Sequence, residues 1–268
     1  MVGIASYGAY IPRYRLGAET VGWNSTVERS VANFDEDSVS MAVAAGVDCL
    51  RGRDRQAVDG LIFATTTPPY SEKQCAAIIA NALDLRRDIF SADVTGVLRA
   101  GTTALKSSLD SVAAGSAGQV LVVASDNRPA APRGDTERSF GDGAAALLVS
   151  HEGTVADFEG FYSITENMLD SWRSAGDPFV RSWEDRFSTE EGLERILGDA
   201  VSGYLNKQGL TPKDVAKVAL YAPDGRRHGQ IIRQMGFKPD QVQDPLFGKL
   251  GNTGAAFPLM LLVNALEH

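Results

Sequence analysis

The sequence predicts an α/β fold built from two similar halves. Segments with strand character alternate with segments of helix character along the 268 residues, a pattern typical of mostly parallel sheets covered by helices on both faces. A weak internal repeat supports two halves: a polar segment leads into a strand that ends at a loop at residues 53–65 and again at 210–223. A glycine turn that opens a buried helix also occurs twice, at residues 96–101 and 251–254.

Composition limits the classes of function. The chain is 44% hydrophobic and 22% charged, as expected for a globular protein with a large core. Its net charge of −8, with no run of Lys and Arg, argues against nucleic-acid binding. We find no apolar run long enough for a membrane span and no signal peptide, so we expect no membrane partner. The two cysteines, Cys49 and Cys75, predict neither a metal site nor a disulfide framework, which favours a cytoplasmic location.

The first half, residues 1–152, contains the clearest secondary-structure signals. Asp35-Glu-Asp-Ser38 is a helix start with capping and acidic side chains, and the helix it opens is expected to reach about Leu50. Residues 57–65 form a nearly continuous apolar run, which predicts a buried parallel strand. The same reasoning predicts further strands at residues 2–12, 90–94, 119–125 and 143–149, and further helices at 71–83 and 100–114.

Residues 93–105 have the layout of a nucleophile elbow. Such an elbow is a strand-to-helix turn that presents one side chain and its backbone N–H to a pocket. Gly96 permits a positive φ in the turn, and Gly101 with its small neighbours lets the helix pack closely.

The second half, residues 153–268, is predicted to repeat this plan with changes. We expect a strand at 158–164, a cap insertion at 165–187, an amphipathic helix at 189–207, a strand within 210–223, a helix at 229–235 and a buried helix after the glycine turn. The first half has two strands after its elbow helix, whereas the second half stops after the equivalent helix. We therefore predict that its last two strands are missing, through truncation or because another chain supplies them, since an uncovered central strand invites pairing.

Several motifs together resemble the thiolase superfamily, in its hydroxymethylglutaryl-CoA synthase and ketoacyl synthase III-like branch. They are the elbow and four further pieces: Val2-Gly-Ile followed by Tyr10-Ile-Pro12, Asp35-Glu-Asp-Ser38, Phe140-Gly-Asp-Gly-Ala144 and Gly251-Asn-Thr-Gly-Ala-Ala256. The resemblance implies a thiolase-like α-β-α-β-α sandwich, usually a homodimer. It also implies acyl-CoA substrates, with coenzyme A entering as part of the substrate and no separate cofactor.

The resemblance also assigns roles by position. The nucleophilic Cys of relatives falls on Leu98, their His on Tyr221 of Tyr221-Ala-Pro223, and their Asn on Asn252. The acidic residue of the synthase branch falls among Thr65–Thr67 and is absent. A leucine cannot form a thioester, so acyl transfer through this position is excluded.

The remaining polar groups indicate chemistry without a covalent intermediate. The Asn252 amide and the backbone N–H groups at the elbow helix start can donate to a thioester carbonyl or enolate oxygen. The Tyr221 hydroxyl can donate or shuttle a proton. These groups suit aldol-type cleavage or formation of a C–C bond in a β-hydroxyacyl-CoA, and hence an acyl-CoA aldolase or lyase, or a synthase-like transferase.

Each candidate also has a structural interpretation. Leu98 either shapes an acyl pocket or fills the core of a site that has lost its catalytic activity. Tyr221 is either a site residue or a packed aromatic, and Asn252 either a site residue or a helix cap. His228 is either a displaced base or part of a solvated loop, and Arg226 and Arg227 either bind CoA phosphates or form an exposed charge pair.

Two of the remaining residues have simpler interpretations. Asp142 lies between Gly141 and Gly143, where we expect it to serve the turn. Cys75, near a helix start, is either a small core residue or an activated thiol that would support a Claisen condensation.

The main alternative to an enzyme is a non-catalytic scaffold subunit of an acyl-CoA-processing complex. Its partner would be an OB-fold/zinc-ribbon protein, present as a separate chain or a fused domain. An enzyme needs an open cavity that reaches Tyr221 and Asn252, whereas a scaffold could have that space filled by Leu98 and its neighbours.

Overall fold

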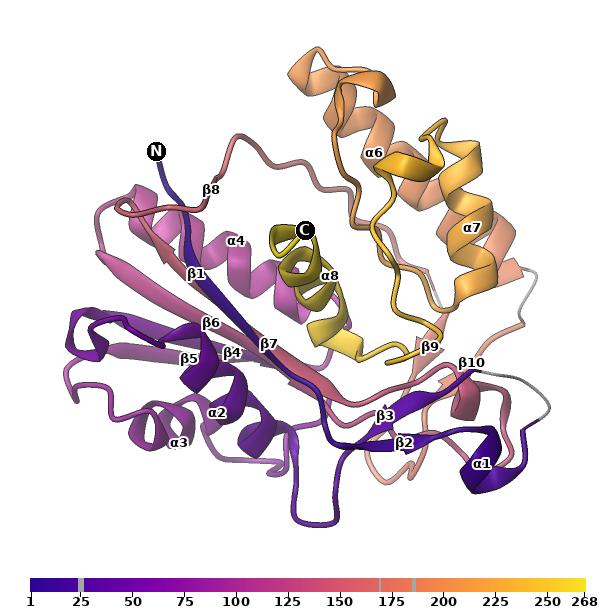
Figure 1. Cartoon of the computed structure of the whole chain (residues 1–268), viewed down its shortest axis with the longest axis horizontal. Coiled ribbons are helices and arrows are strands. Elements are labelled where there is room, and N and C mark those ends of the chain that lie inside the picture. The colour runs from indigo at the N-terminus through magenta and orange to yellow at the C-terminus, as the bar shows by residue number, and fades with distance from the viewer. Residues whose placement is uncertain (24–26, 169, 185–186) are drawn as a thin grey trace.

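The computed structural model describes residues 1–23, 27–168, 170–184 and 187–268. Its centre is a six-stranded sheet with the order β5-β4-β6-β7-β1-β8 (Figure 1). The strands are β1 (Gly3–Tyr10), β4 (Gly60–Thr65), β5 (Phe90–Thr95), β6 (Gln119–Asp126), β7 (Gly143–Ser150) and β8 (Ala156–Asp157). All five strands predicted for the first half are therefore confirmed.

The direction of the strands differs from the prediction of a mostly parallel sheet. β4 runs parallel to β5 and β6, but β7 pairs antiparallel with both β6 and β1. The reason lies in the connection between β6 and β7, residues 127–142, which contains only the short 3₁₀ turn η2 (Asp135–Arg138). Without a crossover helix the chain returns beside β6 in the opposite direction.

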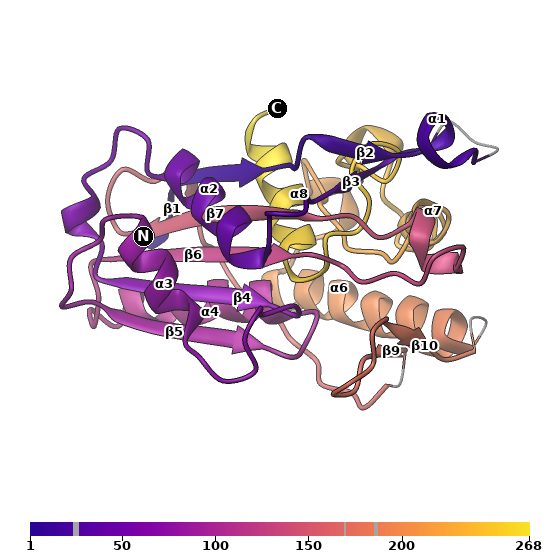
Figure 2. The same cartoon turned by 90° about the horizontal axis from the view of Figure 1, so that it is seen from below.

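Helices cover both faces of this sheet, as predicted. α2 (Ser38–Cys49) and α3 (Cys75–Ala82) pack on one face, and α4 (Ala100–Ala113) and α8 (Phe257–Leu266) on the other (Figures 1 and 2). α2 begins at the predicted capping segment, where the Asp37 carboxylate accepts a hydrogen bond from the Ser40 backbone N–H at 2.7 Å. Each face has its own apolar core, so the sheet is buried on both sides.

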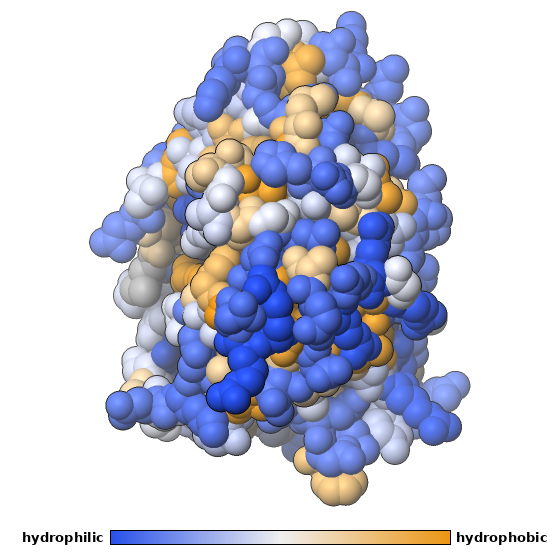
Figure 3. Space-filling model, turned by 90° about the vertical axis from the view of Figure 1, so that its left-hand side faces the viewer, coloured by the Kyte–Doolittle hydropathy of each residue, from blue (hydrophilic) through white to orange (hydrophobic). Residues whose placement is uncertain are grey.

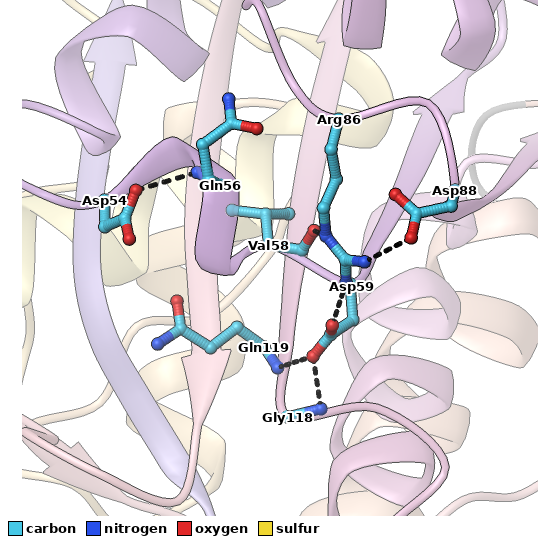
Figure 4. A network of polar contacts seen from close by, with 8 residues as sticks. All are labelled: Asp54, Gln56, Val58, Asp59, Arg86, Asp88, Gly118 and Gln119. Carbon is cyan, nitrogen blue, oxygen red and sulfur yellow. Dashed lines mark hydrogen bonds and ion pairs between the residues drawn. The ribbon is translucent and has the colours of Figure 1, made fainter.

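Polar contacts hold together the amino ends of β4 and β6 (Figure 4). The Asp59 carboxylate accepts hydrogen bonds from the backbone N–H groups of Gly118 at 2.6 Å and Gln119 at 3.0 Å. Arg86 pairs with Asp59 and also with Asp88, at 2.9 Å. The side of the molecule seen in Figure 3 is largely hydrophilic, and its hydrophobic areas are small and separate.

The rest of the chain is mostly helical or extended. An N-terminal arm contains the hairpin of β2 (Tyr14–Leu16) and β3 (Arg29–Val31), with the short helix α1 (Ala18–Val21) between them. The predicted cap region contains a small hairpin, β9 (Ser171–Trp172) with β10 (Arg181–Ser182); Leu169, Asp185 and Arg186 of that region lie outside the described residues. The helical segment η3 (Ser188–Glu194), α6 (Arg195–Gln208) and α7 (Gly225–Gln234) follow. No described helix has the length and apolarity that a membrane crossing requires.

The second half departs from the predicted five-layer sandwich, because among its described residues only the two-stranded β9–β10 hairpin pairs into a sheet and no counterpart of the central sheet forms. Neither 158–164 nor 215–223 is a strand. One parallel bridge joins Val218 to Val242, with the Val218 N–H donating to the Gln241 carbonyl at 2.7 Å and the Gln243 N–H to the Val218 carbonyl at 2.9 Å.

The topology of the first half gives the physical reason. There, β6 and β7 stand between β4 and β1: β6 pairs with β4, β7 pairs with β1, and the two pair with each other. The described second half has no counterpart of either strand, so its extended segments lack the neighbours that would complete a ladder. The division at residue 152 stays a prediction; β8, just beyond it, pairs with β1 of the first half.

Candidate functional site

A cavity of about 1050 Å³ lies beyond the carboxyl ends of the parallel strands. It is enclosed by the turn after β5, the loop after β6, the β9–β10 hairpin, η3, the start of α7 and the second glycine turn. Its lining brings together five of the six residues singled out from the sequence: Leu98, Tyr221, Arg226, Arg227 and Asn252. Carboxyl ends of strands are the usual place for ligands in α/β folds.

The elbow has the expected local geometry. Gly96 adopts a φ of +78°, and α4 begins four residues later at Ala100. Leu98, half-buried, precedes the helix and lines the cavity. Gly101 is needed for a different reason: a Cβ there would lie 2.3 Å from the Ala255 carbonyl oxygen. The first turn of α4 therefore touches the backbone of the second glycine turn.

Asn252 occupies the centre of that second turn and is almost fully buried, with 1% of its surface exposed. Its Oδ1 accepts a hydrogen bond from the Gly254 N–H at 2.9 Å, so it does cap the turn. Its Nδ2 donates to the Tyr221 hydroxyl at 3.3 Å and faces the Ala222 carbonyl at 3.5 Å. The same side chain therefore serves the turn and holds a donor beside Tyr221.

Tyr221 presents its hydroxyl beside the Asn252 amide while its ring packs edge-on against Phe257, with the ring centroids 6.0 Å apart. Loss of water around the hydroxyl raises the pKa of Tyr221, and the Asn252 hydrogen bond and the charge of Arg128 oppose that rise. The net direction is upward, so the hydroxyl keeps its proton at neutral pH and can donate it.

Asp126, at the end of β6, is a residue that the sequence reasoning missed. Its buried carboxylate accepts six hydrogen bonds at 2.6–3.1 Å, from the hydroxyl of Thr65, from the N–H and hydroxyl of both Thr66 and Thr67, and from the Ala255 N–H. The resemblance leaves Thr65–Thr67 without an acidic side chain, but the fold brings one to them from β6. With its oxygens occupied in this way, Asp126 ties the loop after β4 to the second glycine turn, three residues after Asn252.

Arg128, two residues further on, was also missed and lines the cavity. Only 6% of its surface is exposed, and its guanidinium carbon lies 4.1 Å from the centroid of the Phe140 ring. The signal that could have found both residues is their position at the carboxyl end of a buried strand, in Ser125-Asp-Asn-Arg128.

His228 is not brought to the cavity lining. It is 4% exposed within α7, so the solvated-loop interpretation is wrong, because the amphipathic helix turns this side chain inward. Its ring lies against Phe247, which does line the cavity, at 6.3 Å between centroids. Burial lowers the pKa of His228, which favours the neutral ring. Of the two, only Tyr221 lines the cavity.

The two neighbouring arginines differ in their surroundings. Arg226 is exposed at the start of α7. Arg227 is half-buried, pairs with Asp224, and donates from Nε to the Thr189 hydroxyl at 2.9 Å. Of the two, Arg226 has the side chain that is more open to solvent.

Cys75 does not support a Claisen condensation. The side chain is fully buried among α2 and α3, on the face of the sheet opposite α4, and it does not line the cavity. Burial raises its pKa, which disfavours the thiolate that a nucleophile needs. Among the described residues, no group of three His, Cys, Asp or Glu side chains is placed to hold a metal ion.

Asp142 has a structural role in the turn between two glycines, as predicted, and its carboxylate also binds the backbone of two neighbouring segments. Its buried carboxylate accepts hydrogen bonds from the backbone N–H groups of Ala32 and Arg128, both at 2.8 Å. It therefore ties the N-terminal arm to the loop after β6, close to the arginine that lines the cavity.

Comparison with known sequences gives consistent similarities over the whole chain. No family model matches. The chain is 30% identical over 282 residues to a hydroxymethylglutaryl-CoA synthase of Methanopyrus kandleri, covering 100% of this chain and 80% of that protein. It is 31% identical over 280 residues to the enzyme of the same name from Aeropyrum pernix, covering 99% of this chain and 77% of that protein.

Comparison with solved structures gives the same fold at lower identity. A priming β-ketosynthase of the R1128 polyketide pathway superposes with a TM-score of 0.85 at 22% identity, covering 98% of this chain and 86% of the other. The 3-oxoacyl-[acyl-carrier-protein] synthase III of Aquifex aeolicus superposes with a TM-score of 0.84 at 21% identity, covering 100% and 91%. These matches show a thiolase-like α/β fold for the chain.

Proposed function

The chain belongs to the hydroxymethylglutaryl-CoA synthase family, and from that membership we propose that it makes or cleaves a C–C bond of aldol type in a β-hydroxyacyl-CoA without a covalent acyl-enzyme. One observation carries the proposal. The hydroxyl of Tyr221 and the amide of Asn252 lie 3.3 Å apart in a cavity that Leu98 also lines. The site thus combines two hydrogen-bond donors with an apolar residue where the resemblance places the nucleophile.

The absence of a thiol supports a non-covalent mechanism. The chain has two cysteines, and both Cys49 and Cys75 are buried away from the cavity. Leu98 has no atom that can attack a thioester. An aldol reaction needs no nucleophilic side chain, because the new bond forms between the α-carbon of one thioester and the carbonyl carbon of a second molecule.

The proposed roles follow from the donors. In the direction of bond formation, the thioester α-carbon loses a proton to solvent, the resulting enolate carbon attacks a ketone or aldehyde, and the new alkoxide takes a proton from Tyr221, which regains one from solvent. In cleavage, Tyr221 relays a proton: it passes its own to solvent as it accepts that of the β-hydroxyl, the C–C electrons move onto the thioester oxygen, and the enolate then takes a proton from solvent at its α-carbon. Asn252 donates to an oxygen as negative charge develops on it. In this proposal Leu98 shapes the acyl pocket, and Arg226 and Arg227 bind the CoA phosphates.

Tyr221→Phe tests the proposal. The change removes the hydroxyl but keeps the ring against Phe257, so the fold should persist. We expect the turnover rate for cleavage of a β-hydroxyacyl-CoA to fall by about 100-fold or more, a usual size for a lost acid–base group. The assay is release of the shorter acyl-CoA, followed by chromatography.

Tyr70→Phe is the matched control, since Tyr70 is exposed and does not line the cavity; its rate should stay near that of the wild type. Equal turnover rates in the wild type and Tyr221→Phe would show that the Tyr221 hydroxyl takes no part in the reaction. No turnover of any β-hydroxyacyl-CoA by the wild type, in either direction, would remove the enzyme proposal.

A scaffold role is the second candidate, supported by the segments 158–164 and 215–223, which belong to no sheet in the described chain. An OB-fold/zinc-ribbon protein is the partner that the resemblance suggests. The open cavity supports the enzyme over the scaffold, because Leu98 and its neighbours leave about 1050 Å³ beside Tyr221 and Asn252.

A further inference from the structure

The proposed reaction moves a second proton besides the one on the β-oxygen. An aldol addition of a thioester breaks a C–H bond at the α-carbon, and the reverse cleavage makes that bond again. A positioned carboxylate or neutral imidazole accelerates such a proton transfer by about 100- to 10,000-fold. A base beside the α-carbon would therefore complete the site that Tyr221 and Asn252 begin.

The described lining of the cavity contains two carboxylates, those of Asp170 and Asp224, and no histidine. The Asp224 carboxylate is occupied: one oxygen accepts the backbone N–H of Arg227 at 3.0 Å, and the other pairs with the guanidinium of the same residue. Asp170 is exposed, and within the described chain its carboxylate makes no hydrogen bond or ion pair. Hydrogen bonds to a carboxylate favour its charged form, so the Asp170 carboxylate is the one more ready to take a proton.

The β9–β10 hairpin positions Asp170, which directly precedes β9. The N–H of Trp183 donates to the Asp170 carbonyl at 2.9 Å, which joins the two ends of the hairpin. Arg173 Nη2 donates to the Thr66 carbonyl at 3.2 Å, and the Val180 N–H donates to a carbonyl in the loop after β6, also at 3.2 Å. The hairpin is therefore tied to the loops at the carboxyl ends of β4 and β6, on the side of the sheet edge where the cavity lies.

Asp170 also lies on the Tyr221 side of the cavity. Burial is the main cause of the raised pKa of Tyr221, and the negative charges of Asp170 and Asp224 add to it. Such an effect weakens with the distance between the charges, so Asp170 is near the Tyr221 hydroxyl. Nearness is what the reaction requires, because the two groups would serve adjacent carbons: Tyr221 the oxygen on the β-carbon, and Asp170 the proton on the α-carbon.

We propose that Asp170 is the general base that carries the α-proton between the substrate and solvent. In bond formation its carboxylate accepts the proton, the C–H electrons form the enolate, and the enolate oxygen accepts a hydrogen bond from Asn252. Because Asp170 is exposed, it then releases the proton to solvent. In cleavage the protonated Asp170 returns a proton to the α-carbon of the enolate. This inference rests on the proposed aldol function and deepens it.

Exchange of α-protons in D₂O tests the base by itself, because no C–C bond forms or breaks. The intact chain is incubated with acetyl-CoA or butyryl-CoA, and loss of the α-proton signal is followed by proton NMR. We expect the wild type to exchange at least one of the two thioesters. Asp170→Asn should lower that rate by about 100-fold or more, whereas Tyr221→Phe should keep it, since Tyr221 serves the β-oxygen.

Asp177→Asn is the matched control. Asp177 lies in the turn of the same hairpin, pairs with Arg181 at 2.7 Å and does not line the cavity, so its variant should exchange at the wild-type rate. Asp170→Glu keeps a carboxylate on a longer side chain and should retain part of the rate. Binding of acetyl-CoA to Asp170→Asn, measured by titration calorimetry, should match that of the wild type. Asp170→Ser repeats the test if Asp170→Asn does not fold.

Three results would overturn the inference while the proposed function stands. The first is exchange by Asp170→Asn at the wild-type rate. The second is a slower rate that saturating thioester restores, which would assign Asp170 to binding. The third is a wild type that cleaves a β-hydroxyacyl-CoA but exchanges no α-proton. A wild type that does neither contradicts the proposed function itself, and this inference with it.

Discussion

Asp126 shows how one residue can join parts of the chain that are far apart in sequence. Its carboxylate takes hydrogen bonds from Thr65–Thr67 after β4 and from the Ala255 N–H before α8. Hydrogen bonds to a charged group contribute more than neutral ones, and an unsatisfied buried donor costs about 1–3 kcal/mol. The contact between the loop after β4 and the second glycine turn therefore depends on this side chain.

Asp126→Asn should lower the free energy of unfolding by about 2–4 kcal/mol, because an NH₂ group would then face a donor such as the Ala255 N–H. Urea unfolding followed by circular dichroism measures it. Asp110→Asn is the control: Asp110 is exposed and pairs with Lys106 on α4, so its loss should cost less than about 0.5 kcal/mol. Similar losses in the two variants would mean that the Asp126 network contributes little.

The helices α4 and α8 meet because a glycine in the first turn of α4 admits the backbone that precedes α8. Gly101 brings α4 against the Ala255 carbonyl, and α8 follows directly after the turn η6 (Gly254–Ala256). The contact places the elbow of the first half beside Asn252 of the second. The elements, rather than any single side chain, bring Leu98 and Asn252 to one cavity.

Gly101→Ala should destabilise the protein by about 1–3 kcal/mol, although alanine favours helices, because its Cβ would lie 2.3 Å from the Ala255 carbonyl oxygen. Gly198→Ala is the matched control within α6, where a Cβ meets nothing within 4 Å; it should stabilise by up to about 1 kcal/mol. Thermal unfolding compares the two. Stabilisation by both substitutions would show that α4 and the second turn can move apart at little cost.

At the scale of the whole molecule, the two halves differ in how completely their backbone groups are hydrogen-bonded. The first half pairs its strands into one sheet, whereas residues 159–164 have no backbone N–H bonded within the described chain. The α6–α7 side has only a small apolar core around Leu205, Ile232 and Phe237. The second half should therefore open more readily than the first.

Hydrogen exchange tests this difference. Amides of residues 159–164 should exchange at least about 100-fold faster than those of β4 and β6, since exchange from unbonded backbone needs no unfolding of the sheet. Val218 is an internal control, because its N–H is bonded to the Gln241 carbonyl and should be slower. Protection of 159–164 as strong as that of β4 would mean that another chain or segment pairs with them.

Local patterns in the sequence determined the strands and helices of the first half, the capped start of α2 and the glycine elbow, because periodicity, caps and turns act over a few residues. Tertiary structure alone decided the antiparallel course of β7, the missing second sheet, the burial of His228, and the meeting of Asp126 and Arg128 with the Asn252 turn. Those features depend on which distant segments become neighbours, and pairing across 60 to 130 residues leaves no periodic trace in the sequence.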